Sequence, residues 1–134
     1  MINIIRKGKD RRVEKKYDLV KTDCVHKYLD GERFLLFRIQ ALKDITCVDY
    51  SSERIILVKA GDMGGYVETE DNLSQDGSCW VHENSYVYAG GKVSENAQIL
   101  SGSDIVKGAD VKGYTRIGKH TMVCGGEINR KWKG

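Results

Sequence analysis

Proline is absent from this chain, and so are long apolar runs and closely spaced cysteines. No apolar run approaches the roughly 20 residues that cross a bilayer, and the basic N-terminus lacks the apolar core of a signal peptide. We therefore expect a cytoplasmic protein without a membrane span. Four cysteines (Cys24, Cys47, Cys79 and Cys124) form no C-x-x-C pair, which predicts free thiols and no metal site. No cofactor motif is present, so no cofactor is expected.

Glycine, by contrast, is abundant, with 15 residues. Tight corners that recur along a solenoid need glycine, whereas helical proteins rarely do. Charge is uneven, because residues 60–104 hold one Lys or Arg against eight Asp or Glu, and residues 105–134 hold seven against two. Such a dipole either steers a charged partner or aligns copies during assembly. The alternative is an ordinary solvated surface.

A strict period of six residues dominates the C-terminal half. The β-branched members of this repeat are Val81, Val87, Val93, Ile99, Ile105, Val111, Ile117 and Val123. Two residues before each lies a small residue: Cys79, Ser85, Gly91, Ala97, Ser103, Ala109, Thr115 and Thr121. The residue before that is often Gly or Asn, which tolerate the left-handed backbone of a sharp corner. A period of six spreads apolar residues around a helix, so a helical interpretation fails.

These hexads predict an all-β chain that contains a short left-handed parallel β-helix. Three hexads close a coil of about 18 residues, and coils stack at about 4.8 Å. Stacking places Val81 under Ile99 and Ile117, Val87 under Ile105 and Val123, and Val93 under Val111. We expect the β-helix to span residues 67–125, with an irregular first coil near residues 74–78.

The N-terminal half predicts a small antiparallel cap for this β-helix. Alternation of apolar and polar residues predicts one strand over residues 33–46 and another over residues 54–59. The cap, residues 17–66, would cover the open end of the coil stack. Residues 1–16 then form a basic N-terminal arm, and residues 126–134 form a basic C-terminal tail.

The outward positions of the stack fall on three faces. The first face carries Trp80, His82, Gln98, Leu100, Arg116 and Gly118; the second carries Tyr86, Tyr88, Asp104, Val106, Met122 and Cys124; the third carries Lys92, Ser94, Asp110 and Lys112. The second face is too apolar for solvent. We expect its members Tyr86, Tyr88, Val106, Met122 and Cys124 to form an oligomer interface, with a trimer favoured. The alternative is packing by the cap or by the C-terminal tail.

The segment from Gly61 to Val81, GDMGGYVETEDNLSQDGSCWV, followed by the hexads, resembles a family of phage and prophage proteins. In that family a short β-rich head with a G-D-x-G-G-aromatic segment precedes N-L-S, C-W-V and hexapeptide repeats. The resemblance covers roughly residues 33–125 and implies a phage product in the cytoplasm of a host bacterial cell. Its motifs assign no catalytic residue. The hexads alone are also similar to those of the hexapeptide acyltransferases, which use a histidine as general base.

Two histidines are therefore weak candidates for catalysis, His82 beside Trp80 and His120 at a corner. A general base needs a second polar group to orient its ring, and either histidine could equally be an ordinary surface residue. The chain lacks the long loop insertions that build acyltransferase sites. We therefore favour a protein that is not an enzyme, with an acyltransferase-like enzyme as the alternative.

Binding is the favoured function, because a rigid solenoid loses little entropy when it binds. The candidate ligand-binding residues are Trp80, His82, Arg116, Lys119 and His120. A basic cluster is expected around the C-terminal coil, with Trp132 available to stack; its members are Lys107, Lys112, Arg116, Lys119, His120, Arg130, Lys131 and Lys133. Such a cluster could hold a nucleotide or a nucleic-acid backbone, although a solvated basic rim would look the same. The resemblance to phage proteins implies an inhibitor of bacterial antiviral defence that sequesters a nucleotide signal or blocks a host protein. A structural component of phage assembly is the other alternative.

Overall fold

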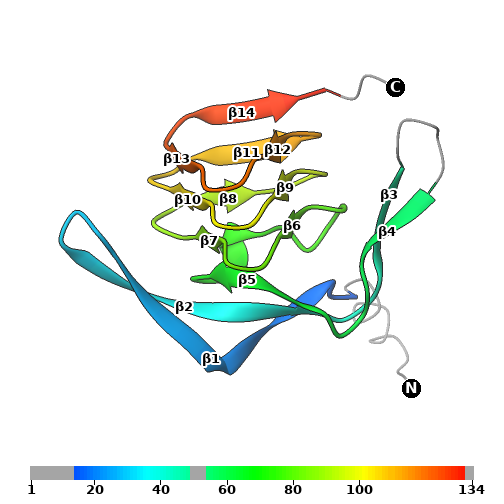
Figure 1. Cartoon of the computed structure of the whole chain (residues 1–134), viewed down its shortest axis with the longest axis horizontal. Coiled ribbons are helices and arrows are strands. Elements are labelled where there is room, and N and C mark those ends of the chain that lie inside the picture. The colour runs from blue at the N-terminus through cyan, green and yellow to red at the C-terminus, as the bar shows by residue number, and fades with distance from the viewer. Residues whose placement is uncertain (1–13, 49–53, 132–134) are drawn as a thin grey trace, which may run out of the picture.

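The computed structural model describes residues 14–48 and 54–131, which form β-strands and one turn of 3-10 helix. The elements are β1 (Tyr17–Leu29), β2 (Glu32–Ala41), β3 (Ile45–Val48), β4 (Arg54–Val58), β5 (Met63–Val67), η1 (Glu70–Asn72), β6 (Trp80–Val81), β7 (Tyr86–Val87), β8 (Lys92–Val93), β9 (Gln98–Ile99), β10 (Asp104–Val106), β11 (Asp110–Gly113), β12 (Arg116–Ile117), β13 (Met122–Cys124) and β14 (Glu127–Arg130). Strands from β5 onward wind into a solenoid of about four turns, and the earlier strands form antiparallel hairpins beside it (Figure 1).

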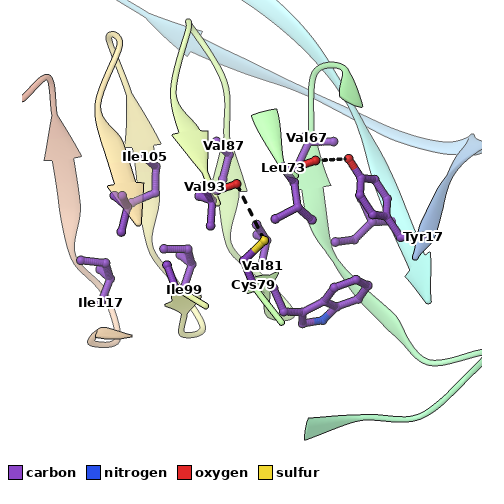
Figure 2. Packing of buried hydrophobic residues seen from close by; sticks show 14 of the residues in the cluster. Tyr17, Val67, Leu73, Cys79, Val81, Val87, Val93, Ile99, Ile105 and Ile117 are labelled. Carbon is purple, nitrogen blue, oxygen red and sulfur yellow. Dashed lines mark hydrogen bonds between the residues drawn. The ribbon is translucent and has the colours of Figure 1, made fainter. Parts of the chain in front are cut away.

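Three parallel ladders build the solenoid walls, in the orders β5-β7-β10-β13, β6-β9-β12 and β8-β11-β14. Their register matches the hexad stacking, because Val81 pairs with Ile99 and Ile99 with Ile117. The aliphatic side chains point into the solenoid and stack coil on coil (Figure 2). The parallel β-helix and its internal ladders predicted from the period of six are thus confirmed.

Hydroxyl groups explain why the small residue of one corner is Ser or Thr in successive coils. Ser85 Oγ donates to the carbonyl of Leu100 at 2.6 Å and accepts from the backbone N–H of Ser103 at 3.1 Å. Ser103 repeats the arrangement one coil higher, donating to Gly118 and accepting from Thr121. These buried hydroxyls satisfy backbone groups that turn away from the ladders at the corner.

The solenoid is longer at both ends than the predicted range of residues 67–125. At its start, β5 already pairs in parallel with β7, with Tyr66 opposite Tyr86. At its end, β14 pairs with β11 and sets Ile128 on Val111, so residues 127–130 are a rung of the solenoid and not a tail. Ile128 follows Val123 by five residues, because Gly125 and Gly126 turn the last corner with φ of +74° and +80°. A strict search for period six stops at Val123.

The cap is a long β1–β2 hairpin, joined to the first coil because β2 pairs antiparallel with β5. A second hairpin pairs β3 with β4. The strand predicted over residues 33–46 is wrong as one element, since β2 ends at Ala41 and β3 begins at Ile45. The turn between them is held to a distant loop, where Asp44 accepts a hydrogen bond from the N–H of Ala60. The strand predicted at residues 54–59 is confirmed as β4.

A buried lysine anchors the cap to the irregular first coil. Lys16 is 1% exposed, and its Nζ donates to the carbonyls of Cys79 at 2.8 Å and Gly77 at 3.2 Å. It also lies 3.3 Å from Cys79 Sγ. Next to it, the Tyr17 hydroxyl donates to the Leu73 carbonyl at 2.6 Å (Figure 2). Lys16 was predicted to end a basic arm but belongs to the core; residues 1–13 of that arm lie outside the described residues.

We expect Lys16→Met to lower the free energy of unfolding by about 2–3 kcal/mol, because buried carbonyls would lose their donor. Urea denaturation followed by circular dichroism measures this change. The control is Lys15→Met, at the neighbouring exposed lysine that pairs with Glu70. This variant should leave the denaturation midpoint unchanged, because exposed ion pairs contribute little to stability. Equal midpoints for all three proteins would contradict an anchoring role for Lys16.

Candidate functional site

The second face of the solenoid is covered by the β1–β2 hairpin of the same chain. Tyr88 and Val106 are 1% and 0% exposed and pack with Leu36 of β2 in a small separate cluster. Phe34 of the hairpin contacts the ring of Tyr88, with ring centroids 5.3 Å apart. This corrects the expectation of an open apolar face, because Tyr88 and Val106 are already buried by the cap, which was the alternative.

Two of the predicted interface residues extend beyond the hairpin. Met122 is 55% exposed, and Cys124 is exposed and has a free thiol. Both lie on β13, the last rung of this ladder. Self-association through this remaining pair stays a prediction. Free thiols are confirmed for Cys24, Cys79 and Cys124, whereas the side chain of Cys47 lies outside the described residues.

A row of cations and aromatic rings fastens the hairpin to the second face. Tyr66 and Tyr86 stack with centroids 5.6 Å apart, and Lys27 of β1 lies 4.1 Å from the Tyr86 ring centre. Lys27 also pairs with Asp104 at 3.3 Å, and Arg38 pairs with Glu83 at 2.8 Å. At the hairpin tip, Asp30 pairs with Lys107 at 2.6 Å. These groups satisfy one another, so we assign them to holding the hairpin and not to binding a ligand.

Burial under the hairpin, together with the nearby Asp104 carboxylate, raises the pKa of Tyr88 to about 12. Its hydroxyl donates to Asp104 at 3.3 Å. The neutral phenol therefore stabilises the folded protein fully below its ordinary pKa of 10.0. That stabilisation is lost as pH rises toward the folded-state value.

We expect Tyr88→Phe to lose less stability than wild type between pH 10 and about 12, because the phenylalanine variant has no phenol to ionise at this position. Urea midpoints measured across this range in the two proteins test the expectation. Tyr28→Phe, at a side chain 67% exposed, is the control and should follow wild type. Parallel curves for wild type and Tyr88→Phe would contradict the assigned cause.

On the first face, Trp80 does not reach solvent. It is 1% exposed, and its ring meets Tyr17 edge to face, with centroids 6.3 Å apart. Trp80 was a candidate ligand-binding residue, but it is buried, because the start of β1 covers the first coil. Trp80, in the first hexad, therefore contacts the cap through Tyr17.

His82 remains partly exposed on this face and is held by a buried amide. Its Nε2 lies 2.8 Å from Oε1 of Gln98, which is 3% exposed. The Gln98 Nε2 donates to the Ser78 carbonyl at 2.6 Å. Burial, and to a lesser extent the charge of Arg116, lowers the pKa of His82 against the opposing effect of Gln98. The sequence analysis placed Gln98 on this face but did not predict that it holds His82. The available signal was a glutamine on the coil next to the one that carries the histidine.

The last coil carries a group of cations that we call the basic rim: Arg116, Lys119, His120, Arg130 and Lys131. All are exposed. None makes an ion pair among residues 14–48 and 54–131. Lys107 and Lys112, which were expected in the same cluster, pair with Asp30 and Glu127 instead. Trp132 and Lys133, which were expected to join this cluster, lie outside the described residues.

The residues of the basic rim lie in β12, at the corners before and after it, and at the end of β14. At the start of β12, the carbonyl of Arg130 accepts from the N–H of Tyr114 at 2.7 Å, and its N–H donates to Thr115 Oγ1 at 3.0 Å. At the end of β12, Lys119 precedes His120, whose ring lies over Gly102 of the coil below and whose φ is +56°. The predicted ligand residues Arg116, Lys119 and His120 therefore lie on one coil, in β12 and in the corner that follows it. His82 lies lower on the first face, and Trp80 is excluded.

Comparison with protein-family models finds no match to the chain, and comparison with curated proteins finds none either. In the described ranges, no helix is long and apolar enough to cross a membrane. The same residues contain no group of three or more His, Cys, Asp or Glu that could hold a metal ion. The fold is that of a β-solenoid protein. Its candidate functional features are the His82–Gln98 pair and the basic rim, which is a candidate anion site.

Proposed function

We propose that this chain is a non-catalytic binding protein that takes an anionic ligand at the basic rim. The observation that carries the proposal is that Arg116, Lys119, Arg130 and Lys131 are exposed at the last coil and make no ion pair among residues 14–48 and 54–131, whereas Lys107 and Lys112 of the same region do. Unpaired cations on a rigid scaffold bind phosphate without rearrangement. A nucleotide is the favoured ligand.

The finer proposal comes from the resemblance to phage proteins. In it, the chain is a self-associating phage product that inhibits bacterial antiviral defence by sequestering a nucleotide signal or blocking a host protein. The exposed Met122 and Cys124 support self-association, and the basic rim supports a phosphate-bearing ligand. An acidic surface of a host protein would meet the same cations.

We expect Arg116→Gln with Lys119→Gln to weaken binding of a fluorescent nucleoside triphosphate at least tenfold, because each lost charge-assisted hydrogen bond contributes about 1.5–3 kcal/mol. The matched control, Arg33→Gln with Lys92→Gln, removes the same charge from exposed positions elsewhere and should change affinity less than threefold. Fluorescence anisotropy at fixed ionic strength measures both. No saturable binding to wild type would refute the proposal, as would equal losses in the two variants.

A second candidate function, acyl transfer, is favoured by the Gln98 hydrogen bond, which supplies the orienting group that a general-base histidine needs. In this case wild type would release coenzyme A from acetyl-coenzyme A in the presence of amine or hydroxyl acceptors. His82→Ala would lower the rate at least a hundredfold. His120→Ala would retain it, since no hydrogen bond from residues 14–48 or 54–131 orients the His120 ring. A wild-type rate equal to that of buffer would exclude this candidate and leave the binding proposal intact.

A further inference from the structure

The cations of the basic rim are spread along one strand of the last coil, at the end of the solenoid opposite the cap (Figure 1). Arg116 lies in β12, and Lys119 lies at the corner after it. Arg130 is held at the corner before it by its backbone hydrogen bonds to Tyr114 and Thr115. A strand rises about 3.3 Å per residue, so the two corners lie about 10 Å apart. The positive charge therefore follows a line.

An exposed aromatic ring lies at one end of this line. The Tyr114 side chain is 44% exposed, and the Tyr114 backbone N–H donates to the carbonyl of Arg130 at 2.7 Å. In the two coils below, the same corner carries Ser78 and Asn96, whose side chains share a hydrogen bond of 2.8 Å. The corner thus forms with small polar residues. Neither the turn nor burial explains an aromatic residue at this position of the last coil.

A line of cations with an exposed aromatic ring is the combination with which proteins hold single-stranded nucleic acid. The cations follow the phosphate backbone, and a base of any kind stacks on the ring through its flat face. A single nucleotide occupies one end of such a line and leaves the other end without a phosphate. The bases of a duplex are already stacked on one another. An acidic protein surface matches the charges but gives the exposed ring no role.

We propose that the basic rim binds a single-stranded nucleic acid. Successive phosphates of the strand contact Arg130, Arg116 and Lys119, and one base stacks on Tyr114. This inference rests on the proposed anion-binding function and names the ligand class for it, a strand of nucleotides in place of a single nucleotide. Because the contacts are to phosphates and to the face of a base, binding depends on strand length and salt and little on sequence.

The test measures fluorescence anisotropy with four probes at fixed ionic strength: a nucleoside triphosphate, octathymidylate, an abasic octamer with the same backbone, and a duplex of eight base pairs. Wild type should bind octathymidylate at least tenfold more tightly than the triphosphate, because the strand reaches both corners. It should bind octathymidylate at least fivefold more tightly than the abasic octamer, the effect of one stacked base. The duplex should bind more weakly than octathymidylate.

Two variants assign the contacts. Tyr114→Ala should bind octathymidylate and the abasic octamer equally, whereas Tyr28→Ala, at a tyrosine 67% exposed on the hairpin, should keep the wild-type preference. Lys119→Gln with Arg130→Gln removes one cation from each corner. It should reduce the slope of log affinity against log salt concentration by about 1.4, or about 0.7 for each lost phosphate contact.

The outcomes separate this inference from the proposed function. A triphosphate or a duplex that binds wild type as tightly as octathymidylate would overturn strand recognition and leave anion binding in place. The same holds for a preference over the abasic octamer that survives in Tyr114→Ala. Failure of wild type to bind any of the four probes would overturn both. Circular dichroism checks the fold of Tyr114→Ala, and if that variant does not fold, the wild-type affinities for the four probes decide the question.

Discussion

A coil of a solenoid satisfies its backbone only through the coils above and below it, and this constraint shapes the whole molecule. Each ladder of this protein has two ends, and an uncovered end leaves unpaired N–H and carbonyl groups. At the start, β2 continues one ladder by pairing with β5, and Lys16 and Tyr17 bond to carbonyls of the irregular loop that completes the first coil. At the far end, β12, β13 and β14 are the last rungs among the described residues.

The segments on which the proposed resemblance to phage proteins rests help to close the first coil. Asn72 of the N-L-S segment is 4% exposed; it accepts from the N–H groups of Glu68 and Thr69 and donates to the Gly91 carbonyl at 2.9 Å. Leu73 is fully buried beside it. Gly65 lies so close to the backbone of the next coil that any side chain would meet carbonyl oxygens. These motifs are explained by packing between the cap and the first coil, which is why they assign no chemistry.

The part of the fold that repeats was predictable from the sequence. Each hexad places one inward residue, and stacking relates it to a neighbour at a fixed separation, so the ladders through Ile99 and Ile105 follow from local pattern alone. The parts that depend on distant residues were not predictable. The break after Ala41 depends on the loop near Ala60, the burial of Trp80 depends on Tyr17, and the last rung at Ile128 depends on a shortened corner.

The candidate site shows the same division. Spacing along the chain was enough to place Arg116, Lys119 and His120 on one coil, because adjacent positions in a solenoid stay adjacent in space. Spacing did not show that the hairpin covers Tyr88, since apolar faces are alike whether a cap or a second copy covers them. The Gln98–His82 hydrogen bond was missed because an outward glutamine looks like solvent-exposed surface until its burial is known.

Positive charge at the last described coil has two physical explanations. The hydrogen bonds on the first face help to distinguish them. Lysine and arginine on terminal strands discourage edge-to-edge association between copies, which would account for Lys119, Arg130 and Lys131 without any ligand. Edge protection gives no reason to bury Gln98, to orient its amide through Ser78 or to hold the His82 ring two coils below the last rung. A binding site needs such preorganised polar groups. The hydrogen bonds below Arg116, more than the charge itself, are therefore the support for the proposed binding function.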